Sequence, residues 1–492
     1  MPKRVLAFDF GASSGRAMTG EYENGVLKVS EIHRFSNDTV TLGGVMYWDY
    51  LRLWFEIKEG IRRALREGPV DAIGIDTWGV DFALLSKDGE LLSNPVHYRD
   101  ERTVGMPEEV SKTVSFHELY VRTGTQTMRI NTVYQLFYLA KYRPDLLALT
   151  DKILFIPDLM AYSLTGAMRS EATISSTSNF FDPRARDFDR NLLGKLGIPD
   201  RLLPPLIRPG ECYGTLKKEL AEEFGCGEIP VLAVCTHDTA SAVFAAPAEG
   251  DFAYVSCGTW SLFGTELKGP LINEQSEAAQ YTNEGGYDGT IRFLRNIMGL
   301  WLIQESRRQW LREGENVTYA DLEREALESK PFLSFIDCDA PEFETAGNLP
   351  ERVRAFCRAT GQHVPENRGE VMRCIYESLA MKYRQNLKKL SGVTGCKYPV
   401  LHMVGGGIKD TLLCRMSADA MGIPVVAGPA EATVMGNLAV QLISLGEIAD
   451  WVDARKVIAR STDLVRYEPR DPAAWDENEA RFLSILGKSA LN

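Results

Sequence analysis

The sequence predicts an α/β protein built from two similar domains. Its 492 residues are too many for one compact hydrophobic core. Residues 4–20 and 252–264 both have the pattern of a strand, a turn of small residues and a second strand. These two units open the two halves of the chain, which is typical of a duplicated fold. We expect domains at 1–246 and 247–470 that face each other across a cleft, and a tail helix at 471–492.

Composition and charge exclude several classes of partner. The formal net charge is −12, which argues against a nucleic acid or an anionic membrane as partner. The N-terminus lacks the pattern of a signal peptide, and no apolar stretch reaches the length of a membrane span. Nine scattered cysteines without a CxxC pair favour a reducing cytoplasm over zinc or a disulfide framework. For Cys357 and Cys374, two buried free thiols are the simpler interpretation.

The first strand–turn–strand unit has the features of a phosphate site. Its turn, GASSG at 11–15, combines glycines with two serine hydroxyls. Glycines let backbone N–H groups close on an anion, and the hydroxyls add donors. Asp9 ends the first strand, where it would hold a magnesium ion through water. The simpler alternative is a β-hairpin with glycine in its turn. The unit is not a P-loop, because the GxxxxGK[ST] pattern is absent.

The stretch 231–243 places an acidic residue at a strand-to-helix junction. An apolar run leads to His237, Asp238 and Thr239, and small helix-tolerant residues follow. The free N–H groups and the dipole of the helix favour an ionised carboxylate there. Such a carboxylate can accept the proton of a hydroxyl that attacks a phosphorus atom. The alternative is that Asp238 or Thr239 only caps the helix.

A third segment, 72–85, mixes apolar and polar groups. A strand leads into Trp78, Gly79 and Asp81. Gly79 allows a ligand to approach closely, whereas the ring and the carboxylate offer the combination that a sugar needs. Core packing followed by a turn explains the same residues equally well. Residues 107–210 have mainly helical patterns and suggest an insertion that completes a substrate site.

The second half contains two further candidate segments. Residues 292–305 run into a helix with Ile297, Leu300, Trp301 and Gln304 at helical spacing, and Asn296 just before it is interpreted as a capping residue. Gln304 lies among apolar neighbours there, so it needs a buried partner or lies at the edge of a ligand. At 400–410 an apolar strand ends in three glycines, and a helix is expected from Thr411. That arrangement suits a phosphate or a flat ring lying on the backbone.

Six segments in order resemble the FGGY family of carbohydrate kinases: GASSGR, GIDTWGVDF, HDTASAV, SCGTWSL, RNIMGLWLIQ and VGGG. The resemblance runs from about residue 5 to residue 445. It implies the actin/hexokinase-type ATPase fold, in which two ribonuclease-H-like α/β domains bind ATP and a sugar in the cleft between them. It also implies Mg²⁺ as the metal that accompanies ATP.

The resemblance implies a role for each matching residue. Asp238 corresponds to the catalytic base. The other positions fall into two groups. The implied sugar contacts are Gly79, His237, Asp238, Thr239 and Asn296. The implied ATP contacts are Ala12, Ser13, Ser14, Gly15, Arg16, Thr259, Gln304 and Gly406.

Within the family, the segments resemble members that phosphorylate L-rhamnulose at its 1-hydroxyl in L-rhamnose catabolism. A kinase for another deoxy-ketose, such as L-fuculose, is the nearest alternative. An actin-like nucleotide switch without sugar chemistry is an alternative from another class. A sugar-sensing regulator is disfavoured because the sequence has no basic face. The expected partners are therefore a ketose and ATP, in a monomer or a homodimer.

Overall fold

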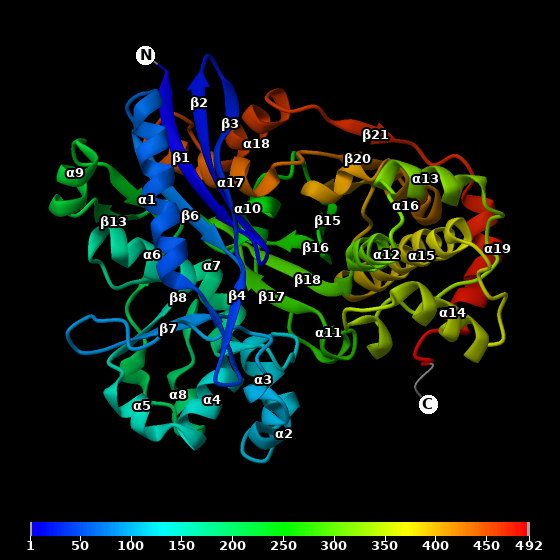
Figure 1. Cartoon of the computed structure of the whole chain (residues 1–492), viewed down its shortest axis with the longest axis horizontal. Coiled ribbons are helices and arrows are strands. Elements are labelled where there is room, and N and C mark those ends of the chain that lie inside the picture. The colour runs from blue at the N-terminus through cyan, green and yellow to red at the C-terminus, as the bar shows by residue number, and fades with distance from the viewer. Residues whose placement is uncertain (1, 490–492) are drawn as a thin grey trace. The chain divides into compact units, whose positions relative to one another are not determined.

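The computed structural model describes residues 2–489 and divides the chain into two compact units (Figure 1). The first unit combines the chain up to Pro247 with Glu266–Phe293 and Ala432–Thr462. The second unit contains Ala248–Thr265, Leu294–Glu431 and the chain from Asp463 onward. The units are therefore discontinuous, whereas the sequence suggests the contiguous ranges 1–246 and 247–470. One reason is that helix α17 (Ala432–Ser444) packs on strands of the first unit.

The first unit is built on a six-stranded sheet with the order β13-β14-β6-β1-β2-β3. Strand β1 is antiparallel to β2 and parallel to β6, and the register places Asp9 beside Asp76. Asn24 and Gly25, both with positive φ, form the hairpin turn between β2 and β3. The strands are β1 Lys3–Phe10, β2 Ser14–Glu23, β3 Val26–Ser36, β6 Ala72–Thr77, β13 Cys212–Thr215 and β14 Pro230–Leu232.

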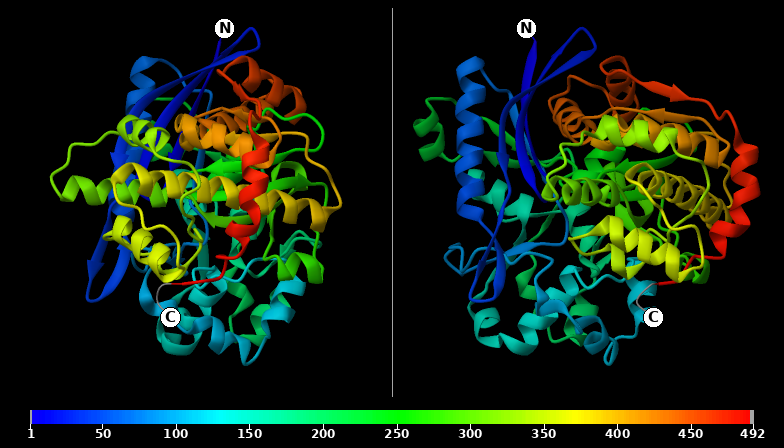
Figure 2. Two further views of the ribbon diagram at one scale, coloured as in Figure 1. Left: turned by 90° about the vertical axis from the view of Figure 1, so that its right-hand side faces the viewer. Right: turned by 45° about the vertical axis from the view of Figure 1, so that its right-hand side comes forward.

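Helices cover both faces of this sheet (Figures 1 and 2). Helix α1 (Tyr50–Glu67) has Asp49 as its N-cap. It buries one apolar stripe against β1, together with α6 (Ile156–Thr165). Helices α10 (Asp238–Phe244) and α17 pack on each other, and both contact β6. The central strands β1 and β6 are therefore buried on both faces of the sheet, which explains why β1 has no exposed polar face.

The insertion of the first unit is mainly helical, as the sequence predicts. Its core is separate from that of the sheet and centres on an antiparallel pair of short strands, β7 and β8. The other α-helices and strands between β3 and β14 are β4 Thr39–Leu42, β5 Val45–Trp48, β7 Phe82–Leu85, α2 Met106–Ser111, α3 Phe116–Thr123, α4 Thr132–Tyr142, α5 Pro144–Leu149, β8 Lys152–Phe155, β9 Ser170–Glu171, α7 Ala172–Ser175, β10 Phe181–Asp182, β11 Asp187–Phe188, α8 Arg190–Lys195, β12 Leu206–Ile207 and α9 Lys218–Phe224.

The second unit contains most of a seven-stranded sheet with the order β17-β18-β16-β15-β19-β20-β21. Strand β15 is antiparallel to β16 and parallel to β19, as β1 is to β2 and β6. The expected second strand–turn–strand unit is thus confirmed, and the two halves share one local topology. The remaining strands are β15 Ala253–Cys257, β16 Trp260–Leu267, β17 Thr282–Gly285, β18 Ile291–Met298, β19 Leu401–Val404, β20 Val425–Ala427 and β21 Val465–Tyr467.

The remaining helices include a long one, α15, and the expected tail helix, α19. They are α11 Glu274–Ala278, α12 Trp301–Arg312, α13 Tyr319–Glu328, α14 Leu349–Ala359, α15 Arg368–Thr394, α16 Thr411–Met421, α18 Trp451–Arg460 and α19 Pro472–Leu483. None of the helices in residues 2–489 is long and apolar enough to cross a membrane. All nine cysteines are free thiols, and Cys357 and Cys374 are buried.

Candidate active site

Asp238 is the first residue of the seven-residue helix α10, and His237 occupies the N-cap position. One carboxylate oxygen of Asp238, Oδ1, accepts hydrogen bonds from the N–H and the hydroxyl of Thr239, at 2.5 and 3.1 Å. Asp238 is therefore not the N-cap of the helix, because His237, one residue earlier, has that position. The side chain keeps 30% of its surface exposed, so it can still contact a ligand.

The charge of Asp238 is set mainly by its surroundings. Burial raises the pKa of Asp238 above its usual value, and the negative charge of Asp9 adds to the increase. The charge that His237 carries when it is protonated and the hydrogen bonds from Thr239 lower the pKa and partly offset this effect. The sequence indicates only that Asp238 lies at a helix start, which favours the ionised carboxylate. It does not reveal the burial of Asp238, which makes the largest contribution to the pKa. A raised pKa makes the carboxylate a stronger proton acceptor.

Two further carboxylates lie at the ends of neighbouring parallel strands. Asp9 ends β1 and pairs with Arg16 at 2.5 Å. Asp76 is fully buried at the end of β6, and Asn437 donates a hydrogen bond to its Oδ2 at 2.5 Å. Burial and the charges of Asp9 and Asp238 raise the pKa of Asp76 well above its usual value. The site therefore concentrates negative charge around Asp238.

This concentration of charge bears on the expected magnesium ion. Among residues 2–489, no group of three or more metal-binding side chains is close enough to hold an ion directly. Oδ1 of Asp76 is buried and has no hydrogen-bond partner within residues 2–489. Mg²⁺ commonly keeps its waters and needs only one or two carboxylates. The residues present fit an ion held by Asp9 through water, and that role of Asp9 stays a prediction.

The first turn exposes the side chains of Ala12 and Ser13. Its ends close through a hydrogen bond from the N–H of Gly11 to the carbonyl of Ser14 at 2.9 Å. Gly15 is required by packing, because a Cβ there would lie 2.3 Å from the ring of Phe35. A phosphate could therefore contact the exposed tip of this turn.

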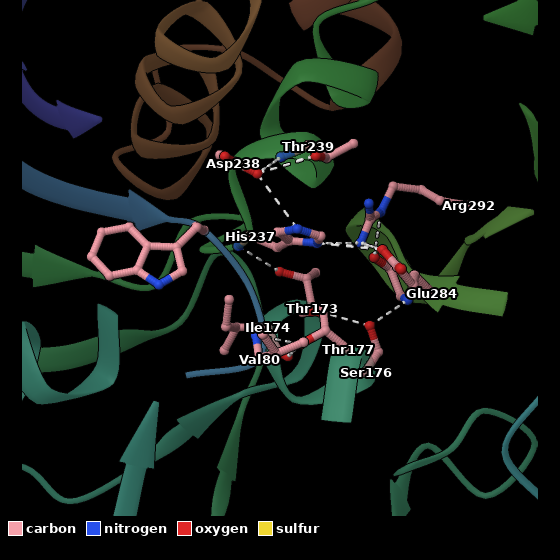
Figure 3. A network of polar contacts seen from close by, with 12 residues as sticks. Val80, Thr173, Ile174, Ser176, Thr177, His237, Asp238, Thr239, Glu284 and Arg292 are labelled. Atoms are coloured by element: carbon pink, nitrogen blue, oxygen red, sulfur yellow. Dashed lines mark hydrogen bonds and ion pairs between the residues drawn. The ribbon is translucent and has the colours of Figure 1, made fainter. Parts of the chain in front are cut away.

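The segment before Asp238 is fixed by a buried carboxylate that the sequence analysis did not identify. Glu171 is fully buried and accepts hydrogen bonds from the N–H and hydroxyl groups of Thr173 and Thr236 and from the N–H of Ile174, over 2.5 to 3.2 Å. Thr173 in turn accepts a hydrogen bond from the N–H of His237 at 3.4 Å (Figure 3). Glu171 thereby fixes the backbone that presents His237 and Asp238.

Gly79 lies against the hydroxyl-bearing side chain of Thr177. A Cβ at Gly79 would come within 3.1 Å of Thr177 Cγ2, and Thr177 Oγ1 accepts a hydrogen bond from the N–H of Val80. Val80 has a φ of +68°, which is uncommon for a β-branched residue. The turn is thus held in a strained conformation beside the helix start, and strain of this kind concentrates at functional sites.

Asp81 has a structural role. It is 1% exposed and accepts hydrogen bonds from the indoles of Trp48 and Trp78, the N–H of Tyr98 and the amide of Gln135. Of the two interpretations of this segment, core packing is therefore correct for Asp81. Even so, burial raises the pKa of Asp81 to about 6.

His97 beside this cluster provides a test by pH. Burial and the charge of Arg99 lower the pKa of His97 to about 4, and its Nδ1 accepts a hydrogen bond from the N–H of Arg99. Between about pH 6.5 and pH 4, the unfolded chain binds a proton at His97 that the folded chain does not. The free energy of unfolding therefore falls as the pH falls. We expect the wild type to lose about 2 kcal/mol more than His97→Asn between pH 6.5 and pH 5, measured by urea unfolding.

Asp81 has the opposite effect in the same pH range, because its raised pKa lets the folded chain bind the extra proton. Both proteins retain Asp81, so it cancels in the difference between them. Parallel stability curves for the wild type and His97→Asn would contradict the assignment of a buried neutral imidazole.

Three expected ATP contacts lie in segments that meet in the second unit. The hydroxyl of Thr259 lies 3.5 Å from the side-chain oxygen of Gln304. The N–H groups of Leu300 and Trp301 at the start of α12 donate to carbonyls of this turn. The three-glycine loop also lies against it, because a Cβ at Gly407 would come within 2.4 Å of Cys257 Sγ. Gly406, next to it, is exposed.

The expectation for Asn296 needs a correction. Residues 292–298 belong to strand β18, and α12 begins only at Trp301, so Asn296 is not a helix cap. Its side chain is half-buried. The strand ends before Gly299, where a Cβ would lie 2.7 Å from the backbone nitrogen of Ser261. The implied sugar contact of Asn296 stays a prediction.

Glu284 and Arg292 face His237 but were not predicted from the sequence, and Asp76 was predicted without a role. A signal for Asp76 was present, since two apolar strands, VLAFD and AIGID, both end in aspartate. Parallel strands that pair in register bring such residues to one edge of the sheet. Nothing in the local pattern indicated Glu284 or Arg292.

Comparisons with known proteins agree with this architecture. The model of the N-terminal domain of the FGGY family of carbohydrate kinases matches residues 4–245, and that of the C-terminal domain matches residues 253–445. A rhamnulokinase of Bacteroides thetaiotaomicron is 44% identical, covering 99% of this chain and 100% of that protein. A rhamnulokinase of Enterococcus faecalis is 41% identical, covering 99% of this chain and 98% of that protein.

Solved structures show the same fold at low sequence identity. A gluconate kinase from Lactobacillus acidophilus has a TM-score of 0.83 at 16% identity, covering 99% of this chain and 98% of that one. A ligand-bound xylulose kinase from the same organism has a TM-score of 0.82 at 16% identity, covering 98% and 97%. The two matched domain models span nearly all of the two-domain α/β fold described above, and this chain belongs to the FGGY family of carbohydrate kinases.

Proposed function

We propose that this chain transfers the γ-phosphoryl group of ATP to the 1-hydroxyl of L-rhamnulose, giving L-rhamnulose 1-phosphate and ADP. The sugar is inferred from the curated relatives, which are named rhamnulokinases and match over nearly their whole length. The observation that carries the chemistry is the position of Asp238, a partly exposed carboxylate with a raised pKa at the start of α10.

In this mechanism, Asp238 accepts the proton of the 1-hydroxyl as its oxygen attacks the γ-phosphorus. The bond from that phosphorus to the bridging oxygen breaks at the same time, and ADP leaves. His237, Thr239, Gly79 and Asn296 orient the sugar. When bound, Mg²⁺ supplies positive charge to the phosphates, and Asp9 would hold it through water.

The nucleotide is assigned to the two turns and the loop beside the second turn. The exposed tip of the first turn would donate its backbone N–H groups and serine hydroxyls to the phosphates. Thr259, Gln304 and Gly406 would bind the remainder of the nucleotide, and their segments converge in the second unit. Arg16 pairs with Asp9, so it would reach a phosphate only by sharing or leaving that partner. The cytoplasmic location and the monomeric or homodimeric state stay predictions.

The test is a panel of ketoses assayed with the purified chain, ATP and Mg²⁺. We expect the highest kcat/KM with L-rhamnulose and a lower value with L-fuculose, because a site that hydrogen-bonds one pattern of hydroxyls rejects another. A preference for L-fuculose would replace the assigned substrate. ATP hydrolysis that no sugar accelerates would contradict a sugar kinase and favour a nucleotide switch.

A further inference from the structure

The imidazole of His237 lies between the carboxylate of Asp238 and a buried ion pair (Figure 3). Its Nδ1 is 3.0 Å from Nη2 of Arg292 and 3.4 Å from Oε2 of Glu284. Its Nε2 is 3.4 Å from Oδ1 of Asp238. The ring is 8% exposed, so water has little access to it. The hydrogen positions on this ring are therefore decided by its protein neighbours.

Arg292 determines which ring nitrogen carries the hydrogen. A guanidinium group has only donors, so Nη2 can approach Nδ1 to 3.0 Å only if Nδ1 accepts through its lone pair. The hydrogen of a neutral ring then lies on Nε2, which faces Asp238. A hydrogen on Nδ1 would instead face the N–H hydrogens of Nη2 at 3.0 Å, which places a donor against a donor.

The guanidinium group is itself held in place. Arg292 is fully buried, and its Nε donates a hydrogen bond to the carbonyl of Gly285 at 2.9 Å. Nη2 also pairs with Oε2 of Glu284 at 3.0 Å. Burial raises the pKa of Glu284, but the charges of Arg292 and of a protonated His237 outweigh it and hold that pKa below its usual value. The imidazole therefore meets a pair with no net charge.

Other charged groups near the ring have partners of their own. Glu171 is bonded to Thr173 and Thr236, below the backbone of His237. Asp76, on the strand that bridges to His237, is bonded to Asn437. Neither lies at Nδ1, where the N–H group of Arg292 at 3.0 Å sets the hydrogen-bonding role of that nitrogen.

We propose that Arg292 and Glu284 are positioning residues that hold His237 as a neutral imidazole with its hydrogen on Nε2. The inference rests on the proposed role of Asp238 as the base. In this form the ring donates a hydrogen bond toward that carboxylate or the sugar without carrying a positive charge. A positively charged ring at this distance would stabilise the ionised carboxylate and weaken it as a proton acceptor.

The first test measures by NMR which ring nitrogens of His237 carry a hydrogen, and it does not depend on catalysis. The full chain is labelled with ¹⁵N-histidine, and its six histidines are recorded by long-range ¹H–¹⁵N correlation. Loss of one signal set in His237→Gln assigns His237. At pH 7.5 we expect an unprotonated Nδ1 and a protonated Nε2. A hydrogen on Nδ1, or on both nitrogens, would overturn the proposal.

The second test removes the donor with Arg292→Met. Nδ1 then faces only the carboxylate of Glu284, so we expect it to take up a proton and the ring to become charged near neutral pH. We expect kcat at pH 7 to fall about 10-fold, to recover as the pH rises, and KM for ATP to stay unchanged. Arg292→Lys, which keeps a cationic donor, should restore part of the activity. Arg4→Met, the loss of a buried arginine elsewhere in the first unit, should leave the pH profile unchanged.

A double variant guards against misfolding, because a buried carboxylate without its partner can destabilise the unit. Arg292→Met with Glu284→Gln removes both charges, and we expect a neutral ring that populates both tautomers without the shifted pH profile. An equal loss of kcat at every pH in Arg292→Met, with the ring unchanged, would reduce the arginine to a structural role and overturn the proposal. If the wild type shows the expected ring signals but the Asp238→Asn variant still turns over, the tautomer is supported and only the role of Asp238 as the base is refuted.

Discussion

Asp238→Asn is expected to lower kcat by roughly 10²-fold or more while ATP binding is kept. Asparagine has nearly the same shape, and its side-chain oxygen can still accept the hydrogen bond that Thr239 donates. The amide cannot take up the hydroxyl proton, so the variant loses only the base. The measurement is steady-state kinetics with L-rhamnulose, together with calorimetric titration of ATP.

The matched control is Asp88→Asn, which changes an exposed aspartate in a turn of the same unit. It should leave both kcat and ATP binding at wild-type values. In the wild type, kcat should decline toward acid pH at a higher pH than an ordinary aspartate would cause, because burial raises the pKa of Asp238. Near-normal turnover by Asp238→Asn would remove this residue from the proposed mechanism.

Local patterns predicted most elements, because each pattern had one physical explanation. The alternating strand that ends at Asp9 and the apolar strand that ends near Asp76 both lie in the first sheet. The stripe of α1 is buried where the 3.6-residue period places it. The start of the helix after β18 was predicted a few residues too early, because the apolar residues from Ile297 onward fit a helix and a strand equally well. The close approach of Gly299 to Ser261, which separates strand from helix, depends on tertiary packing.

Only part of the candidate site could be predicted, because the rest also depends on tertiary packing. Asp238 and the two turns are visible locally, since each is a polar or glycine-rich break after an apolar strand. Arg292 is 55 residues from His237, and Asn437 is 361 residues from Asp76. Their pairing follows from the topology of the sheet and cannot be derived from spacing. Burial, which dominates the pKa of Asp238, is likewise a property of the assembled unit.

Helix α17 packs on α10, the helix that carries Asp238, through small residues. Gly436 faces the backbone of Ser241 in α10. A Cβ at Gly436 would lie 2.0 Å from the carbonyl oxygen of Ser241 and 2.7 Å from its carbon. These are backbone atoms, so no side-chain rotation can relieve the overlap. One of the two helices must move, and α10 carries Asp238 at its first residue.

We therefore expect Gly436→Ala to destabilise the first unit by about 3 kcal/mol and to lower kcat at least about 10-fold. Urea unfolding and steady-state kinetics measure the two effects. The control is Gly194→Ala in α8, where a Cβ meets nothing within 4 Å. That change should leave kcat unchanged and stabilise the protein by about 0.5–1 kcal/mol, because alanine favours a helix over glycine. Gly436→Ala with wild-type stability and kcat would mean that α10 and α17 are not in contact as described. A loss of stability with full kcat would mean that the position of Asp238 does not depend on this contact.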